Sequence, residues 1–207
     1  MRLSRLLREG SRTEHEAAEG AAFIGELLAG RVDEQGYADY LARLHRVYAA
    51  LEEVGRDLAD HPVAGVVHDR ALERCAALSA DREHWGAGDA DTPATDAYVG
   101  RIESTRDEPL RYLAHHYTRY LGDLSGGQAI GRLLDREWSL SGAGLAFYDF
   151  AEIPRPKPYK DAYRARLDAL VLSEQERTLV LDEVKRAFGL NGDLFAELSA
   201  ALDSYRR

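Results

Sequence analysis

The sequence predicts an all-α protein that folds as a single domain over residues 1–207. Three observations support this fold class. Apolar residues recur at intervals of three and four along most of the chain, which is the period of an amphipathic helix. No run alternates apolar and polar residues between turn signals, as a strand would. The breaks between the periodic stretches are short, so we expect one domain of roughly eight helices.

Two stretches carry the clearest helical pattern. The first lies between Tyr37 and Leu58, and the second opens with Ser173 and Glu176 at the spacing of a capping box. The apolar stripe of the first stretch consists of Tyr37, Tyr40, Leu41, Leu44, Val47, Tyr48, Leu51, Val54 and Leu58. The stripe of the second consists of Leu179 or Val180, Val184, Phe188, Asn191, Phe195, Leu198 and Leu202. We expect both stretches to be long helices that bury one face.

Four short segments interrupt the helical pattern. They are rich in glycine, proline, serine and aspartate, and they lie at residues 59–62, 86–93, 139–147 and 152–159. Such a composition is typical of loops between helices, and none of the segments resembles a flexible interdomain linker.

The composition limits the function. Apolar residues make up 45% of the chain and charged residues 30%, and the net charge is −9. This acidity weighs against a non-specific nucleic-acid binder. The single cysteine, Cys75, excludes an internal disulfide and a cysteine-ligated metal cluster. No apolar run approaches the roughly 18 residues of a membrane span, so we expect a soluble, cytoplasmic protein that binds neither membrane nor nucleic acid.

Four glycines fall within one apparently helical segment, Tyr117–Leu134. Each glycine inside a helix costs about 0.5–1 kcal/mol relative to alanine, so their concentration needs a reason. A phosphate-binding loop is excluded, because glutamine and alanine follow Gly127 in place of lysine and serine or threonine. The charges of Asp123, Arg132 and Asp135 exclude a membrane-helix dimer.

Projection of this segment at about 100° per residue places the four glycines over one half of the helix, with Asp123 in the middle of the bare arc. Two interpretations follow. The arc contacts either a closely packed neighbouring helix or a flat, bulky ligand whose centre is reached by one acid. Clustered glycines also favour a kink at this point. Geometry alone does not choose between the two interpretations.

A ligand of this kind needs a second binding residue elsewhere in the chain. The seven histidines form neither the Glu-x-x-His pairs of a di-iron bundle nor the His-Glu-x-x-His motif of a zinc site. Only His15 is followed at i+4 by a carboxylate, Glu19, which can hold one imidazole nitrogen and leave the other free to bind iron. A surface pair without further function is the simpler interpretation of these two residues alone.

Taken together, these segments resemble the heme oxygenase family. YTRYLGDLSGGQAIG is similar to the family's signature segment, which forms a kinked helix over the distal face of heme, and LREGSRTEHEAAEGAAF is similar to its proximal helix. RLHRVYAALEE and KPYKDAYRARLDAL match further family segments in the same order. The resemblance runs from about residue 3 to 203 and implies an all-α fold with heme between two helices.

The resemblance implies roles for the matching residues. His15 is expected to bind the heme iron, with Glu19 as the partner of its other ring nitrogen. Gly122 and Gly126 are expected to form the distal contact surface. Asp123 is expected to organise distal water and, through it, the proton needed to activate oxygen.

Further matches concern polar side chains around the heme. Tyr48 and Arg119 match residues of the family's distal polar network. The residues that match the propionate-binding positions are Arg8, Tyr117, Lys160 and Arg164. Arg8 stands where some members carry lysine, which keeps the charge and changes the hydrogen-bond geometry.

The activity implied is that of a soluble, bacterial-type heme oxygenase. Such an enzyme opens heme b to biliverdin with O2 and releases carbon monoxide and ferrous iron; heme is both its substrate and the group that activates oxygen. No nucleotide or flavin motif is visible, so electrons are expected from a ferredoxin or flavodoxin with its reductase. We expect a monomer. The alternative is a non-catalytic heme carrier of the same fold, which would need His15 but neither Asp123 nor the glycines.

Overall fold

Ten α-helices and five short helical turns make up the chain in the computed structural model, which describes all residues from Met1 to Arg207. The α-helices are α1 (Leu3–Gly10), α2 (Arg12–Glu19), α3 (Ala22–Leu28), α4 (Glu34–Asp57), α5 (Cys75–Trp85), α6 (Pro93–Glu103), α7 (Pro109–Gly122), α8 (Gln128–Trp138), α9 (Pro156–Asp168) and α10 (Glu174–Ala200). The short turns are η1 (Ala64–Val66), η2 (Arg70–Leu72), η3 (Asp123–Gly127), η4 (Ala146–Tyr148) and η5 (Leu202–Ser204). No strand forms, apart from one isolated bridge between Val32 and Arg206, and the predicted all-α fold is confirmed.

The chain has more helices than the roughly eight expected, and its N-terminal part shows why. α1 and α2 meet at Ser11, whose φ of −109° departs from the helical value. The buried Ser11 hydroxyl donates to the carbonyl oxygen of Leu7 at 2.7 Å, a side-chain bond that competes with regular helix. α2 then ends at Gly20 before α3 begins. The segment LREGSRTEHEAAEGAAF, expected to form one helix, is thereby divided among α1, α2 and α3.

The expected loops at 59–62 and 86–93 are confirmed, whereas residues 156–159 of the last expected loop are helical and η4 begins inside the loop expected at 139–147. Ser173 and Glu176 form the predicted capping box at the start of α10, since each side chain accepts the backbone N–H of the other residue. α6 and α9 begin with Pro93 and Pro156, at or near the ends of two predicted loops. Proline suits this position because the first N–H of a helix has no intrahelical partner.

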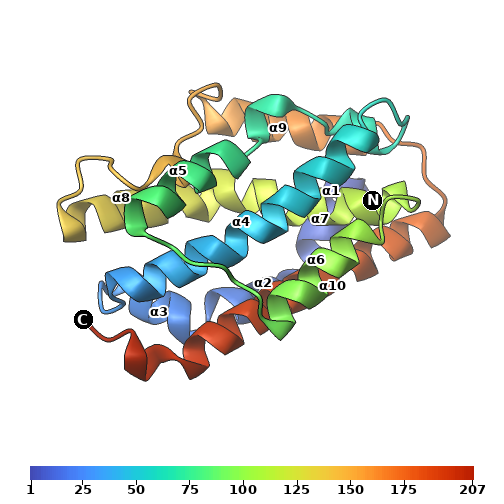
Figure 1. Cartoon of the computed structure of the whole chain (residues 1–207). Coiled ribbons are helices and arrows are strands. Elements are labelled where there is room, and N and C mark those ends of the chain that lie inside the picture. Colours follow the sequence, from blue (N-terminus) through green and yellow to red (C-terminus); the bar gives the residue numbers. More distant parts are fainter.

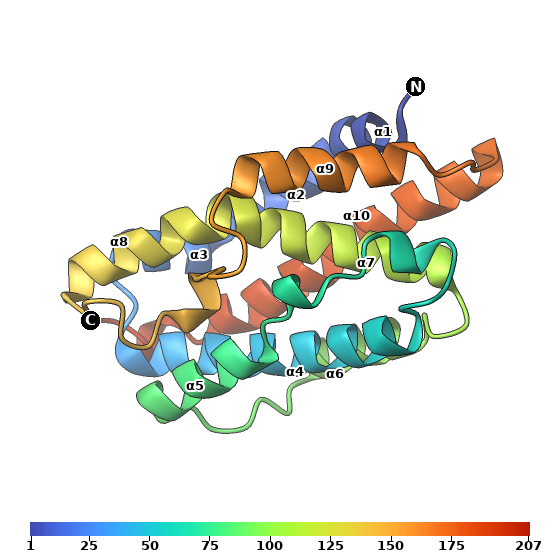
Figure 2. The same ribbon diagram turned by 90° about the horizontal axis from the view of Figure 1, so that it is seen from above.

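The two longest helices, α4 and α10, organise the core. α10 packs against α2, α3, α6 and α7, and α4 packs against α5 and α6 (Figure 1). From above, α7 and α8 follow one another between α9 on one side and α4 with α5 on the other (Figure 2). The apolar stripe predicted for α4 is buried in one hydrophobic cluster of 44 residues. None of the helices combines the length and the apolar character that crossing a bilayer requires.

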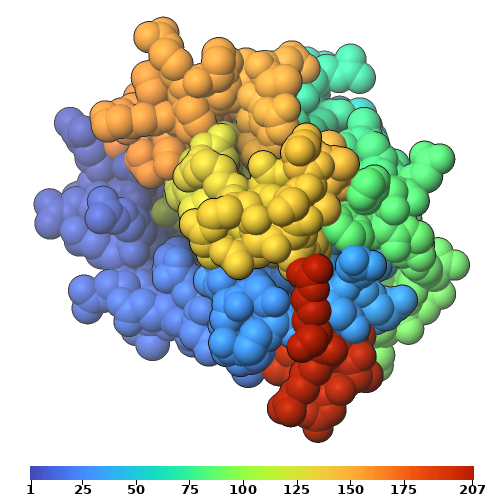
Figure 3. Space-filling view, turned by 90° about the vertical axis from the view of Figure 1, so that its left-hand side faces the viewer, coloured from blue at the N-terminus to red at the C-terminus, as the bar shows by residue number.

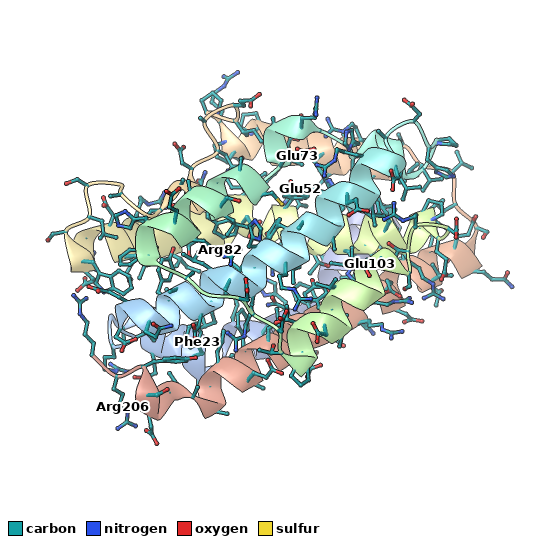
Figure 4. The ribbon with its side chains drawn as sticks, in the orientation of Figure 1. Phe23, Glu52, Glu73, Arg82, Glu103 and Arg206 are labelled. Carbon is teal, nitrogen blue, oxygen red and sulfur yellow. The ribbon has the colours of Figure 1, made fainter.

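Buried carboxylates fasten parts of the chain together. Glu52 of α4 is 4% exposed and accepts the backbone N–H groups of Arg74 and Cys75, so it holds the start of α5. Figure 4 shows Glu52 and Glu73 near one another beside η2, where the Arg56 guanidinium lies 3.9 Å from the first carboxylate and 3.5 Å from the second. Burial and the neighbouring Glu52 raise the pKa of the Cys75 thiol, which leaves it unreactive.

A second buried carboxylate, Glu183, joins α10 to α6 and α7. It is 1% exposed and accepts hydrogen bonds from Arg101 at 2.7 Å, Arg111 at 2.8 Å and His115 at 2.9 Å. Burial opposes its ionisation, but these three donors hold the pKa of Glu183 well below its usual range. His115 is therefore a structural residue, as is His116, whose Nδ1 lies 2.9 Å from the hydroxyl of Tyr163.

Candidate active site

The glycine segment, which we define as residues 122–131, passes from α-helix to π-helix and back. α7 ends at Gly122, the π-helical turn η3 spans Asp123–Gly127, and α8 continues directly from Gln128. A π-turn adds a residue to the helical register. The projection at 100° per residue therefore fails after the first glycine of the segment.

The four glycines face two different sides. Gly122 and Gly126 are exposed, and a Cβ added to either would meet no atom within 4 Å. A Cβ on Gly131 would approach Cβ and Cγ of Tyr148 to 2.7 and 2.8 Å, and one on Gly127 would meet the same side chain at 3.7 Å. The prediction that all four glycines lie on one bare face of the helix is wrong. Close packing explains Gly131, whereas Gly127 faces the same side chain with room for a Cβ. Only Gly122 and Gly126 form an open surface without side chains.

Asp123 lies beside this open surface and points into the protein. It is 8% exposed, and its carboxylate accepts a hydrogen bond from the hydroxyl of Tyr48 on α4. The Arg119 guanidinium lies 3.9 Å from the other carboxylate oxygen and donates to the Tyr48 hydroxyl at 3.2 Å. Asn191 of α10 accepts a hydrogen bond from Arg119 at 2.7 Å. Three helices thus contribute to one buried polar cluster.

Burial dominates the electrostatics of this cluster. It raises the pKa of Asp123, although the Arg119 cation and the hydrogen bond from Tyr48 act in the opposite direction. Burial also raises the pKa of Tyr48, so its hydroxyl keeps its proton and remains a donor. A carboxyl group with a raised pKa exchanges a proton at a pH closer to neutral. The cluster therefore places a carboxyl group with a raised pKa next to the open glycine surface.

His15 lies on α2 and is accessible from outside. Its side chain is 49% exposed, and Nδ1 lies 3.5 Å from a carboxylate oxygen of Glu19. The ring contacts Phe188 of α10 edge-on, with 5.5 Å between the ring centroids. Because Nδ1 faces Glu19, Nε2 is the nitrogen left for a metal or another ligand.

Cationic side chains of α1 and α9 lie near the glycine segment. The Lys160 ammonium donates to the hydroxyl of Ser125, within η3, at 2.9 Å. Burial raises the pKa of the Tyr117 hydroxyl, while the charges of Arg164 and Arg8 lower it. Arg8 and Arg164 lie on α1 and α9, two helices that pack against each other, and α9 also contacts η3. The four residues that the sequence associates with two carboxylates of a ligand thus come from α1, α7 and α9.

The surface around these residues is hollowed. Figure 3 shows the N-terminal helices in blue, α8 in yellow and α9 in orange, with a recess between the blue and yellow elements. An open depression elsewhere is lined by Asp33, Glu34, Gln35, Trp85 and Arg207. It is mainly polar and contains none of the residues described above, so it is not the candidate site.

Comparisons with known proteins agree with this arrangement. The heme oxygenase family model matches residues 1–197. The heme oxygenase of Pyropia yezoensis is 37% identical over 96% of this chain and 87% of its own length, and heme oxygenase 1 of Rattus norvegicus is 39% identical over 97% and 72%. The crystal structure of heme oxygenase-1 from Synechocystis sp. PCC6803 in complex with heme gives a TM-score of 0.91 at 32% identity and covers 99% of this chain and 95% of that one.

The solved structures that this chain resembles are heme oxygenases, so the fold is one that this class of enzymes uses. The extent of the matches identifies the protein more narrowly. The chain belongs to the heme oxygenase family.

Two features of the site were not recognised in the sequence. Asn191 was placed in the apolar stripe of α10, yet its amide binds Arg119. A polar residue within an apolar stripe is itself a signal, since buried polar groups need partners. The role of Tyr148 in packing against Gly131 left no signal, because it depends on a contact between η4 and α8.

Proposed function

We propose that the enzyme opens the porphyrin ring of heme b to give biliverdin, with release of carbon monoxide and ferrous iron. The observation that carries this proposal is the open backbone surface of Gly122 and Gly126 directly beside the buried acid Asp123. A flat ring can approach such a surface closely, and a proton source lies at its edge.

The residues present fit a bound heme. Any side chain at Gly122 or Gly126 would fill the space that the ring needs, and neither position carries one. We assign the iron to Nε2 of His15, with Glu19 fixing the ring through Nδ1 and increasing its basicity. A neutral imidazole suits this chemistry better than a thiolate, which favours cleavage of the O–O bond.

The propionates of heme require cationic partners at one edge of the site. Lys160 and Arg164 of α9 and Arg8 of α1 provide three cations, and Tyr117 provides a hydroxyl. Held at two carboxylates, the ring cannot rotate freely in its plane. These contacts would therefore decide which meso carbon faces the distal wall.

The buried cluster supplies the proton. Heme, when bound, supplies both the iron that activates O2 and the ring that is opened. Asp123, acting through a water molecule, would deliver a proton on the side of Gly122 without touching oxygen itself. Tyr48 and Arg119 hold its carboxylate in place. A protein that only carried heme would have no use for this cluster, so the catalytic function is favoured over the carrier function.

Electrons come from a separate protein in this proposal, and the donor class is a ferredoxin or flavodoxin with its reductase. Both kinds of donor are acidic. Basic residues of α1 and α9 would face such a donor, namely Arg8, Lys157, Lys160 and Arg164, although Lys157 and Arg164 also pair with Asp161. The sequence also suggests Arg119 for this role, but its side chain is buried and cannot take part. We propose that the enzyme acts as a monomer.

The site is tested by filling the open surface. We expect Gly126→Leu to weaken heme binding by about 100-fold, because its side chain occupies the space of the ring. The heme-free variant should unfold at the same or a higher temperature, since the new Cβ meets no atom and leucine favours helix. Gly100→Leu on α6, where a Cβ also meets no atom, is the matched control and should bind heme normally. Equal heme affinity in both variants would contradict the site.

The reaction is tested with hemin, ascorbate and air. Absorbance of biliverdin and release of carbon monoxide are expected from the wild-type protein. A stable heme complex without biliverdin would instead establish the carrier function.

A further inference from the structure

The short turn η4 (Ala146–Tyr148) lies behind the glycine segment, on the side away from the open surface. Tyr148 packs directly on Gly131, where even a methyl group would collide with its Cβ and Cγ. The neighbouring Phe147 contacts the ring of Tyr48 edge-on at 5.5 Å, and Tyr48 binds Asp123. One turn therefore touches both the backbone of the glycine segment and the partner of the distal acid.

η4 is itself held firmly by α5. Asp81 is 1% exposed, and its two carboxylate oxygens accept the backbone N–H of Ala146 at 2.8 Å and of Phe147 at 2.7 Å. Burial raises the pKa of this carboxyl, and the two N–H bonds lower it. Nothing in the proposed function uses Asp81, which lies on a different helix from every residue of the site.

A second bond from α5 fixes the chain just before η4. The indole N–H of Trp85 donates to the carbonyl oxygen of Gly144 at 2.8 Å. Gly144 has φ +69°, and a Cβ there would lie 2.4 Å from the same indole nitrogen. The approach is so close that only glycine is accommodated. Two side chains from one helix thus hold residues 144–147 at both ends.

The segment in front of η4 is the part of the site most able to move. A π-turn with adjacent glycines is easily displaced, because glycine restrains the backbone least and the regular i to i+4 bonds are interrupted. On one side a Cβ at Gly122 or Gly126 would meet no atom, so the segment can be displaced in that direction. Elsewhere it is held by side-chain bonds from Tyr48 to Asp123 and from Lys160 to Ser125, and η4 packs against its backbone at Gly131. Between Gly131 and Tyr148 there is no room even for a methyl group, so a displacement of α8 toward η4 meets close-packed atoms.

We propose that η4 is a stop that fixes the position of the glycine segment, and that Asp81 is a positioning residue that acts through η4. The stop would set how far the distal surface stands from the substrate and where the carboxylate of Asp123 lies. This inference rests on the proposed function only in taking heme to be what lies against Gly122 and Gly126.

The test compares Gly131→Ala with Gly127→Ala, two identical changes on the side that faces η4. The first places a methyl group 2.7 Å from Tyr148 and must displace η4 or α8, whereas the second makes only ordinary contacts at 3.6 and 3.7 Å. Asp81→Asn is the third variant, because the amide keeps one acceptor and loses the other. It keeps the test decisive if Gly131→Ala does not fold.

Two measurements are made on each variant. In the heme-free protein, we expect amide hydrogen exchange of residues 122–127 to become about tenfold faster in Gly131→Ala and Asp81→Asn, and to stay within about threefold in Gly127→Ala. In the ferric heme complex, we expect the pH midpoint of the optical alkaline transition to move by about half a unit or more in the first two variants only.

Three outcomes separate the possibilities. Equal exchange rates and midpoints in Gly131→Ala and Gly127→Ala would overturn the inference. Faster exchange that extends equally to α6 would also overturn it, because the effect would then be loss of global stability. Faster local exchange with an unmoved midpoint would support η4 as the stop and contradict instead the proposal that the segment lies over heme.

Discussion

The hydroxyl of Tyr48 on α4 donates a hydrogen bond to the carboxylate of Asp123, a residue 75 positions later in the chain. Both side chains are buried, and Arg119 contacts each of them. The acid beside the open glycine surface is therefore held by two buried side chains. Several expected outcomes depend on this relationship.

Replacing Tyr48 by phenylalanine removes the hydrogen bond and keeps the ring. Asp123 loses its neutral donor, and the Arg119 Nε–H loses its acceptor. We expect the free energy of unfolding to fall by about 1–3 kcal/mol and biliverdin formation to slow by about tenfold, with heme affinity unchanged. Chemical denaturation and a biliverdin assay measure the two effects. Unchanged turnover would show that Tyr48 does not orient the acid.

Asp123→Ala tests the proton source. The variant should still bind heme, because the open surface is formed by glycine backbone. We expect biliverdin formation to fall by about 100-fold or more, the usual contribution of a positioned acid, and peroxidase activity to increase. Optical heme titration and product analysis follow the two properties. Normal turnover would remove the proposed role of the acid.

His15→Ala tests the iron ligand. The histidine-ligated optical spectrum of the heme complex should disappear and should return when imidazole is added to the solution. Glu19→Gln is the control, since it keeps the ligand and weakens only the contact at Nδ1. A wild-type spectrum in His15→Ala would mean that another residue binds the iron.

Lys157→Glu tests the docking surface for the electron donor. Its side chain is 89% exposed and takes part in no buried contact, so the fold should be unaffected. We expect slower reduction by an acidic ferredoxin, and a smaller dependence of the rate on salt, because opposite charges accelerate encounter. Arg206→Glu is the control, as this residue lies near the C-terminal end, far from α9 in Figure 4. Equal rates in both variants would exclude Lys157 from docking.

Because His116 is buried, we expect the protein to lose stability in acid. Burial lowers its pKa from 6.5 to about 3, with smaller contributions from the charges of His68 and Arg166. Because the native pKa is the lower one, the unfolded chain takes up the proton first, and stability falls as the pH drops below about 6.5. Between about pH 7 and pH 4, we expect the free energy of unfolding of His116→Gln to fall by about 2–3 kcal/mol less than that of the wild type. Parallel stability profiles measured by denaturation would contradict this account.

Much of the fold could be predicted because the signals are local. The stripe of α4 and the capping box at Ser173 depend on residues within one or two turns. The start of α9 was missed, because Pro156 was placed in a loop although proline also suits the first turn of a helix. The division of the N-terminal stretch was missed, because the bond from Ser11 to Leu7 interrupts a pattern that otherwise continues. The glycine projection failed for a related reason: the clustered glycines predict a kink at this point but not the π-turn that shifts the helical register.

The sequence by itself determined the class of fold, the family and the identity of the candidate ligand and acid, since these follow from composition, periodicity and a long signature segment. Only the tertiary structure decided which glycines are open and which are packed. It also showed that Asn191 joins the polar cluster and that Asp81 holds η4 behind it. The physical reason is that a helical pattern specifies which face is buried but not which side chain meets it, and that partner comes from a distant part of the chain.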